Sequence, residues 1–332
     1  MSRIFIAVFC SLLSFAWMEP ALAAREGCDR PKLTAPVAVS QPAGTDVTVA
    51  TQNLWRLFDD VKDGGQVLTT EQYDLKRTKL ARQIVEVLRL PDVVAVQEVE
   101  NRRVLAGLAT AVARLSGRPA YQSLVLEGMD PGGIDVGFLV RADWKVLAVK
   151  QLLTDKRLDS HPLFDRPPLH IVLQDLSGQR LELVNVHLKS LKGSEHPGKV
   201  KKIASKRRLQ AQALAGWWRQ YVRSYPRVAL LMLGDFNATP EVLGGVDVLG
   251  ELHAAGLVMT SDRLPAEQRY TYVYQCRPEL IDNILASPGM VARIRALEAS
   301  RGNADRHRRV SKEGDTAAGS SDHDALVLYL QR

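Results

Sequence analysis

The sequence has few cysteines and lacks the short motifs that define several large enzyme classes. Among its 332 residues are three cysteines, and none lies in a Cys/His cluster with the spacing of a zinc site. A Walker loop and a Rossmann glycine fingerprint are also missing. The nucleotide and zinc sites that these motifs build are therefore excluded. The composition, with 46% hydrophobic and 24% charged residues, is that of a globular protein.

Long apolar runs are missing beyond the N-terminus. Residues 4–17 are nearly all apolar, Arg3 precedes them, and small residues follow up to Ala23. This order predicts a signal peptide over 1–23, cleaved near Ala23, and export to the periplasm or the medium. An uncleaved membrane anchor is the alternative, although the run is shorter than the ~20 residues that a membrane span needs. No later segment is long and apolar enough to span a bilayer.

Cleavage at that position leaves an even pair of cysteines, Cys28 and Cys276. In an oxidising compartment such a pair predicts a disulfide. The disulfide would tie the start of the mature chain to its C-terminal half. Two unpaired thiols are the alternative.

The chain is basic, with a formal net charge of +7 and a pI of about 9.3. Two stretches, 189–208 and 301–312, concentrate lysine and arginine, and each follows a candidate catalytic strand. A basic surface attracts polyanions such as nucleic acid, anionic lipid or phosphorylated substrates. A polyanion track and an ordinary solvated face both fit these stretches.

Apolar strands alternate with helices from residue 47 onwards, after an extended lead-in over 24–46. The segments 134–140 and 145–152 are expected to be neighbouring strands, and 170–176 with 181–187 a hairpin. We expect further strands at 47–53, 92–97, 228–233, 280–286 and 325–330, and helices at 73–88, 101–115 and 205–225. Without a repeat or a linker, the pattern predicts one α/β domain over 47–332. Its fold class would be a four-layer α/β/β/α sandwich of two mixed sheets with helices outside.

Polar residues lie just past several of these apolar strands, where active sites are commonly built. They are Asn53, Glu98, His187, Asp235, Asn237, Asp282, Asp322 and His323. Carboxylate and amide oxygens suit a hard cation such as Mg²⁺. A histidine paired with an aspartate can take a proton from water. Each residue alone fits a structural role, but together they favour a metal-dependent phosphoesterase.

The same segments resemble, in order, the motifs of the endonuclease/exonuclease/phosphatase superfamily, whose fold is that of pancreatic deoxyribonuclease. The matching segments are TQNLWRLFD at 51–59, VQEV at 96–99, NVHLKS at 185–190, GDFNATP at 234–240, ID at 281–282 and SDHD at 321–324. GDFNATP is the most specific of them. The resemblance runs from about residue 47 to 329 and implies an exported, bacterial-type member with this superfamily's fold.

The resemblance implies a metal site around Glu98, with Asp322 and Asn53 near the ion or positioning its waters. Mg²⁺ is the expected ion, with Mn²⁺ and Ca²⁺ as alternatives. Trp55 stands where many relatives have an acidic residue, which favours a single dominant metal.

The resemblance also implies catalytic roles. His323 would be the general base or would hold the scissile phosphate, and Asp282 would fix its tautomer. Asp235 and Asn237 would lie beside the attacking water and the phosphate oxygens. His187 would donate to a phosphate oxygen or assist the leaving group.

Further candidates are weaker. Asp135 follows Gly133, where relatives often have a basic residue, and either orients a site residue or caps a strand edge. Lys189, Lys192 and Arg207 are candidates for substrate binding because they lie in the first basic stretch.

Three functions follow, in decreasing order of support. The first is an exported phosphodiesterase, most simply a monomeric endonuclease that hydrolyses nucleic acid with base-activated water. The second is a phosphatase or lipid phosphodiesterase that acts on an inositol phosphate or a sphingomyelin-like lipid. The third is an inactive binding module, which the joint presence of all the candidate site residues disfavours.

Overall fold

A computed structural model describes residues 35–332 except 64, 243–244 and 306–313. The predicted signal peptide, the first part of the lead-in (24–34), Cys28 and part of the second basic stretch lie outside these residues. The predicted disulfide with Cys276 therefore stays a prediction. The described chain belongs to one compact unit, Pro31–Arg332.

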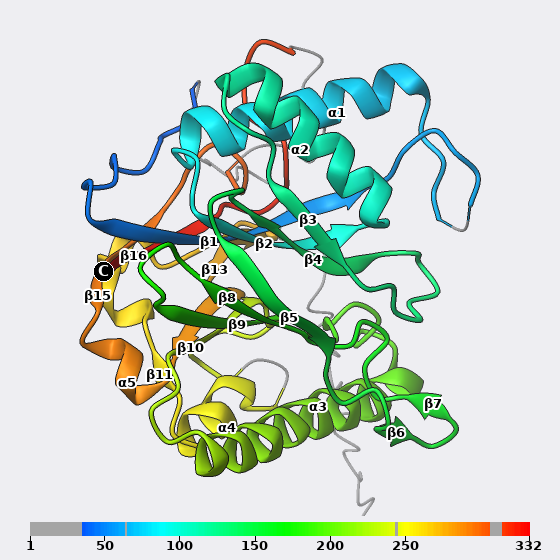
Figure 1. The fold of residues 1–332 in the computed structure, drawn as a ribbon. Coiled ribbons are helices and arrows are strands. Elements are labelled where there is room, and N and C mark those ends of the chain that lie inside the picture. Colours follow the sequence, from blue (N-terminus) through cyan, green and yellow to red (C-terminus); the bar gives the residue numbers. More distant parts are fainter. Residues whose placement is uncertain (1–34, 64, 243–244, 306–313) are drawn as a thin grey trace, which may run out of the picture. The chain divides into compact units, whose positions relative to one another are not determined.

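Two six-stranded mixed sheets form the centre of this unit (Figure 1). The first sheet has the order β15 (Ile294–Ala299), β16 (Leu326–Gln331), β1 (Asp46–Leu57), β2 (Val93–Val99), β4 (Asp135–Val140) and β3 (Gln122–Val125). The second has the order β11 (Val258–Met259), β14 (Asp282–Ala286), β10 (Leu230–Asp235), β9 (Arg180–His187), β8 (Leu169–Gln174) and β5 (Lys145–Gln151). Two small hairpins pair β6 (Arg157–Leu158) with β7 (His161–Pro162) and β12 (Tyr272–Tyr274) with β13 (Arg277–Glu279).

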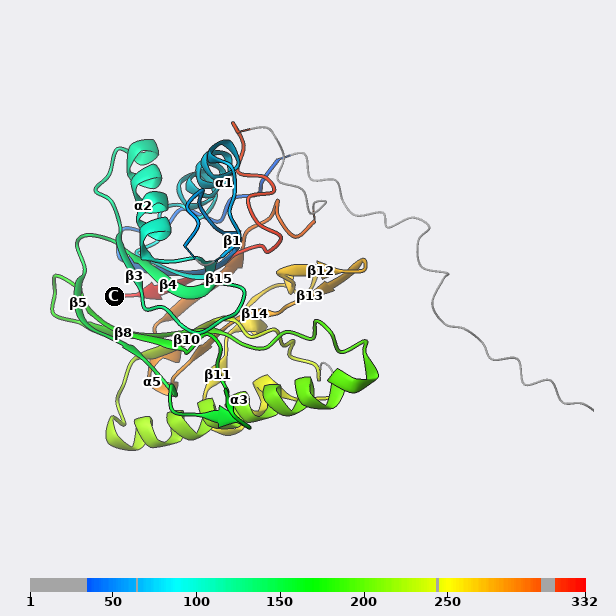
Figure 2. The same ribbon diagram turned by 90° about the vertical axis from the view of Figure 1, so that its right-hand side faces the viewer.

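Helices cover the outer face of each sheet (Figures 1 and 2). Those over the first sheet are α1 (Thr70–Arg82), which continues as a π-helical turn (Gln83–Val87), and α2 (Arg102–Ser116). Those over the second are α3 (Pro197–Ser224) and α4 (Val248–Ala254), while α5 (Pro288–Val291) and two 3₁₀ turns (Ser261–Arg263 and Ala266–Gln268) lie in connections. The arrangement is the predicted four-layer sandwich.

Apolar side chains fill the interface between the two sheets and the interfaces between each sheet and its helices. On β1, Val47 and Val49 point into the cluster between the sheets, whereas Ala50 and Leu54 belong to the cluster beneath α1 and α2. A strand that is buried on both faces needs apolar residues at successive positions. This requirement explains why the central strands read as continuous apolar runs. A third cluster, which includes Trp218, lies between the second sheet and helices α3 and α4.

Most predicted elements are confirmed. Thr69 caps α1 with Gln72 in a reciprocal capping box, and β8 with β9 forms the predicted hairpin. The long helix begins at Pro197, earlier than the predicted residue 205, because a proline in the first turn needs no donor there.

One pairing is wrong: β4 and β5 are not neighbours, although only four residues separate them. β4 belongs to the first sheet and β5 to the second, where it pairs with β8. The intervening Trp144 is buried in the cluster between the sheets. The chain therefore crosses from one sheet to the other at this point.

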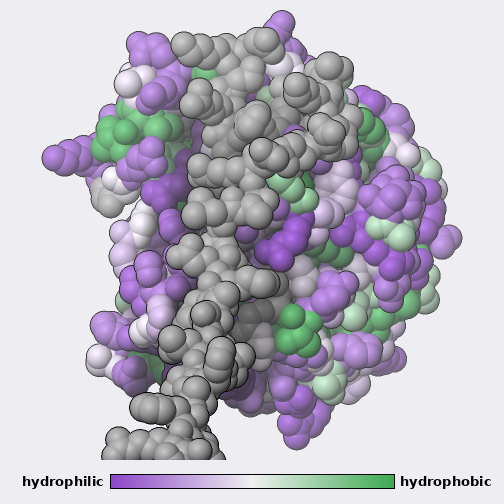
Figure 3. Space-filling model, turned by 180° about the vertical axis from the view of Figure 1, so that it is seen from behind, coloured by the Kyte–Doolittle hydropathy of each residue, from purple (hydrophilic) through white to green (hydrophobic). Residues whose placement is uncertain are grey.

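Within the described ranges, no helix combines the length and the apolar character needed to cross a bilayer. On the part of the face in Figure 3 that is not drawn in grey, residues are mostly hydrophilic, and the apolar ones form small separate groups.

Candidate active site

The candidate site lies where strands of both sheets end. β1 runs parallel to β2, which aligns Asn53 with Gln97, the residue before Glu98. β10 runs parallel to β9 and antiparallel to β14, which places Asp235 opposite His187 on one side and Asp282 on the other. Asp322 and His323 precede β16. The topology thus brings the polar residues predicted from these motifs to one end of the sandwich.

The side chain of Asn53 connects the two sheets. It is fully buried, and its Nδ2 donates to Glu98 Oε1 and to Asp235 Oδ2, both at 3.2 Å. Its Oδ1 accepts the backbone N–H of Trp55 at 2.8 Å. One amide therefore holds two carboxylates at fixed positions.

Glu98 and Asn237 have left-handed backbones, with φ of 61° and 48°. This region is unfavourable for residues other than glycine and costs of order 1–3 kcal/mol each. The Asn237 turn is held by its own N–H, which donates to Asp235 Oδ1 at 2.8 Å, and by its Nδ2, which donates to Leu188 O at 3.1 Å. The motif residues are thus fixed by specific contacts in conformations that the chain alone disfavours.

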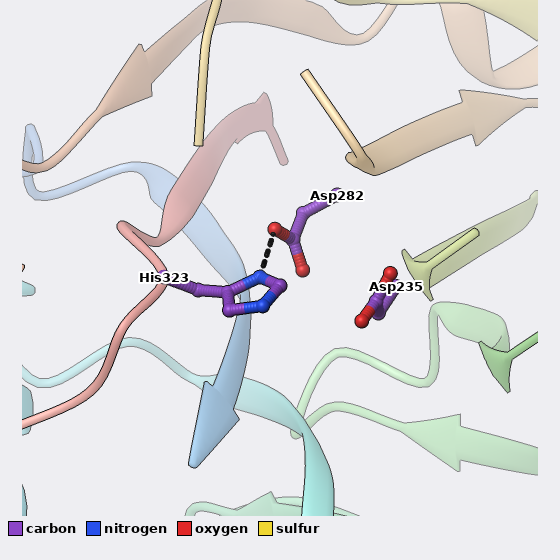
Figure 4. A group of neighbouring side chains, drawn as sticks. All are labelled: Asp235, Asp282 and His323. Atoms are coloured by element: carbon purple, nitrogen blue, oxygen red, sulfur yellow. Dashed lines mark hydrogen bonds and ion pairs between the residues drawn. The ribbon is translucent and has the colours of Figure 1, made fainter. Parts of the chain in front are cut away.

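His323 and Asp282 form a buried pair. His323 Nδ1 lies 2.7 Å from Asp282 Oδ2, and Figure 4 shows this contact with Asp235 beside it. Burial alone would lower the pKa of His323, but the charge and the hydrogen bond of Asp282 outweigh it and raise that pKa well above its ordinary value. The described geometry therefore favours the imidazolium. Tyr272 packs against the imidazole, with 4.8 Å between ring centroids.

His187 has the opposite electrostatic setting. Its Nε2 lies 3.5 Å from Asp235 Oδ2 and 3.9 Å from Glu98 Oε1. Burial, with the charges of Arg166 and His323, lowers its pKa well below the ordinary value, so a neutral imidazole is favoured. Burial and the charge of Asp282 raise the pKa of Asp235 to about 7. A carboxylate that titrates near neutrality is suited to accept a proton from water.

The donor set fits a hard divalent cation. Glu98 and Asp322 keep 19% and 15% of their side-chain surface exposed, more than the other site carboxylates. Asp235, Asp282 and His323 can also bring ligand atoms within 4.8 Å of one another, but His323 and Asp282 already bind each other. Glu98 and Asp322, with Asn53, therefore stay the predicted ligands of a cation.

Arg207 differs from its prediction as a substrate-binding residue. It is 1% exposed, and its Nη1 donates to the carbonyls of Lys189 at 2.8 Å and Asn237 at 2.7 Å. The guanidinium thus fastens two loops that follow site strands, and it is enclosed by protein. Lys189 is half-buried and Lys192 is exposed, so both keep their predicted role as a proposal.

Asp135 and Asn283 are structural in their contacts. Asp135 Oδ1 accepts the N–H of Gly128 at 2.8 Å, and burial raises the pKa of this carboxyl to about 6. Asn283 Nδ2 donates to Ala238 O at 3.1 Å and Leu280 O at 3.2 Å. Asp135 therefore holds the loop at Gly128, and its predicted accessory role stays a prediction.

Sequence reasoning missed two cations beside the site. Lys76 on α1 donates to the carbonyls of Trp55 and Arg56. Arg166 Nε donates to His187 O at 3.4 Å, and its Nη1 lies 3.2 Å from Asp130 Oδ1. Neither belongs to a motif, because a lysine on a helix and an arginine before two prolines have no distinctive local pattern.

Comparisons with known proteins agree with this geometry. A family model described as Endonuclease/Exonuclease/phosphatase family matches residues 49–302. No curated protein matches the sequence significantly.

Solved structures with the same fold include an endonuclease/exonuclease/phosphatase family protein from Bacteroides thetaiotaomicron. It is 16% identical with a TM-score of 0.57, and the match covers 88% of this chain and 98% of that one. A humanized D. rerio TDP2 is 17% identical with a TM-score of 0.55, over 87% of this chain and 100% of that one. The human Nocturnin catalytic domain with a bound sulfate anion is 16% identical with a TM-score of 0.54, over 87% and 95%. At these identities the likeness shows the fold alone.

Proposed function

The chain belongs to the endonuclease/exonuclease/phosphatase family, and from this premise we propose that it is a metal-dependent phosphodiesterase that hydrolyses nucleic acid. One observation carries the proposal. Asn53 ties Glu98, on the cation side, to Asp235, whose carboxylate lies within 4.8 Å of ligand atoms of the Asp282–His323 pair. A cation site, a proton acceptor and a proton donor thus meet at one place. Hydrolysis of a phosphodiester needs these three functions.

The chain's own residues divide the chemistry. When bound, the cation would neutralise charge on the phosphoryl oxygens. Asp235 accepts the proton of the attacking water, because its carboxylate is held by Asn53 and Asn237 beside the Asp282–His323 pair. Asn237, two residues further on, lies beside this water.

Two histidines complete the site as donors. His323, held as an imidazolium by Asp282, donates to a non-bridging phosphate oxygen. His187, neutral and on the far side of Asp235, donates to a second oxygen or to the leaving group. Of the two expected roles of His323, its raised pKa favours holding the phosphate over removing the proton.

Charge supports a nucleic-acid substrate. The net charge is +7, and the first turns of α3 carry three exposed basic residues, Lys199, Lys201 and Lys202. Such a surface binds a phosphate backbone, and binding should then weaken steeply as salt increases. Among the structural neighbours, D. rerio TDP2 was solved with a single-strand DNA product, which fits the same substrate class.

We also propose that Mg²⁺ is the ion, that the protein is exported after cleavage near Ala23, and that it acts as a monomer. The apolar 4–17 run and the small residues before Ala24 support export. Carboxylate and amide ligands support Mg²⁺ over softer metals. Cell fractionation with N-terminal sequencing of the mature protein tests export. A mature protein that retains residues 1–23 would contradict it.

The central experiment compares three substrates with each added cation: plasmid DNA, bis-p-nitrophenyl phosphate and p-nitrophenyl phosphate. We expect DNA and the diester to be hydrolysed with Mg²⁺, and activity to disappear with a chelator. Glu98→Ala and His323→Ala should each lose about 10²-fold or more in rate. Hydrolysis of the monoester alone would indicate a phosphatase, and inactivity on all three would contradict the proposal.

A further inference from the structure

A cavity of about 490 Å³ lies next to the candidate site, between α1 and the end of β1. Its lining includes Trp55, Arg56, Gln66, Leu68, Leu75 and Lys76. The volume is within the range of small-molecule sites, roughly 300–1,000 Å³. Trp55 and two leucines form the apolar part of the lining, and cations, amides and the carboxylate of Glu71 form the polar part. None of the roles assigned above uses this cavity.

Trp55 links the cavity to the candidate catalytic residues. It follows Asn53 by two positions, and its backbone N–H donates to Asn53 Oδ1 at 2.8 Å. Lys76 reaches the same segment from α1, and its ammonium donates to the carbonyls of Trp55 and Arg56. A group bound against Trp55 would therefore lie two residues from Asn53, the side chain that binds both Glu98 and Asp235.

The backbone of β1 departs from regular strand geometry at Trp55 and Arg56. Trp55 and Arg56 have φ of 49° and 57°, and the pairing of β1 with β2 shifts between Asn53 and Leu57. Such conformations are unfavourable for both residue types and concentrate at functional sites. Lys76 stabilises the distortion through the carbonyls of Trp55 and Arg56. The result is a half-buried indole and an exposed guanidinium at the end of an otherwise buried strand.

The Trp55 indole lies against a buried cation, Lys76. The ammonium of Lys76 lies 5.3 Å from the centroid of the Trp55 ring, a cation–π distance. Leu68 and Leu75 line the same cavity. A fixed aromatic face binds any base by stacking, since every nucleobase has a π-face. Arg56 offers positive charge for the phosphate that accompanies such a base, and Gln66 offers an amide for its edge.

We propose that this cavity binds the unpaired nucleobase beside the scissile phosphodiester, stacked on Trp55. The inference rests on the proposed phosphodiesterase activity and adds a substrate preference to it. A base inside a duplex cannot enter such a cavity without leaving its stack. The chain would therefore act on single strands and frayed ends in preference to intact duplex.

The test uses diesters that share one leaving group. Thymidine 5′-(p-nitrophenyl phosphate) and thymidine 3′-(p-nitrophenyl phosphate) carry a base, and methyl p-nitrophenyl phosphate does not. The measured quantity is the base preference, defined as kcat/KM for the better thymidine ester divided by kcat/KM for the methyl ester. We expect a preference of roughly tenfold or more in the wild type, in keeping with the usual strength of base stacking.

Two substitutions probe the cavity from different elements. Trp55→Ala should lower the base preference by roughly tenfold, and Trp55→Phe should restore most of it because the aromatic face is kept. Leu75→Trp fills the cavity from α1 and should lower the preference as well. Trp217→Ala, a tryptophan substitution on α3 that stacks on Tyr221, is the matched control and should keep the wild-type preference. Thermal unfolding checks that each variant is folded.

The outcomes separate the two proposals. If the wild type hydrolyses none of the three esters with any cation, the phosphodiesterase proposal fails and the subsite with it. If it hydrolyses all three with a base preference near one, the activity stands and the subsite is wrong. The subsite is also wrong if folded Leu75→Trp keeps the wild-type preference, whatever Trp55→Ala does to overall turnover.

Discussion

The amide nitrogen of Asn53 lies 3.2 Å from the carboxylate of Asp235, although the two residues are 182 positions apart and belong to different sheets. The same nitrogen donates to Glu98. The candidate site therefore depends on the two sheets being held in register at this end. A single short side chain supplies that connection.

Asn53→Ala should impair both activity and stability. It leaves the buried carboxylate of Asp235 without this donor, which costs about 1–3 kcal/mol of unfolding free energy. We expect a rate loss of about 10²-fold, because Asp235 and Glu98 lose the amide that holds both carboxylates in position. Urea unfolding and steady-state kinetics on the diester measure the two effects. A variant with normal turnover would show that the bridge is dispensable.

Asp282→Asn should reduce turnover while leaving the fold intact. The substitution removes the charge that raises the pKa of His323, so the imidazolium is no longer favoured at neutral pH. We expect kcat to fall by about 10²-fold or more, with a smaller change in KM, because the donor acts most strongly in the transition state. Near-UV circular dichroism checks the packing of the variant. A kcat within a few-fold of wild type would contradict the assigned role.

Asp135→Asn should stabilise the protein at neutral pH. Burial raises the pKa of Asp135 to about 6 in the folded chain, above the ordinary 3.8. The folded state then holds the proton more tightly, so stability falls as pH rises from about 4 through 6. Asparagine keeps an oxygen for the Gly128 N–H and carries no charge. We expect a gain of about 1–3 kcal/mol at pH 7.5.

The pH dependence distinguishes this effect from a general gain in packing. The advantage of Asp135→Asn should shrink as pH falls from 7 and be absent near pH 4, where the wild-type carboxyl is protonated in both states. Denaturant unfolding at several pH values measures it. An advantage that is equal at pH 4.5 and 7.5 would contradict the raised pKa as its cause.

Much of the fold and the choice of candidate site residues could be predicted, because the signals lie in short segments of the sequence. Residues such as Glu98 and Asp235 stand directly after apolar strands, and strand ends in a layered α/β fold lie close in space. The capping box at Thr69 and Gln72 fixes the start of α1 from four residues alone. The separation of β4 from β5 could not be predicted in this way. Apolar alternation shows that a strand is buried but not which sheet receives it.

The burial of two cations, Arg207 and Lys76, could not be predicted for a related reason. Arginine and lysine are mostly exposed, so a basic stretch suggests a surface. Arg207 and Lys76 are buried because backbone carbonyls from distant segments meet them. Contacts with backbone carbonyls of distant residues cannot be predicted from a local sequence pattern. Trp55 was visible only as a departure from the family pattern, and its cavity requires α1 in place beside it.

Glu98→Gln should weaken cation binding. The substitution keeps the oxygen that accepts from Asn53 but removes one negative charge from the ligand set. We expect at least a tenfold higher Mg²⁺ concentration for half-maximal activity. Isothermal titration with Mg²⁺ provides a readout that does not depend on turnover. Unchanged Mg²⁺ affinity would place the ion elsewhere, for example at Asp235 and Asp282.

Arg207→Met tests whether a basic residue near the site acts through the backbone or on the substrate. Methionine fills similar space but leaves the carbonyls of Lys189 and Asn237 without their donor. We expect a loss of about 2–4 kcal/mol in unfolding free energy, together with slower turnover on every substrate, large or small. Arg208→Met is the matched control, since Arg208 is exposed on the same helix. Its stability should change by less than about 0.5 kcal/mol. If instead Arg207→Met unfolded like the wild type and lost activity only on DNA, with a reduced salt dependence, Arg207 would contact the phosphate backbone after all.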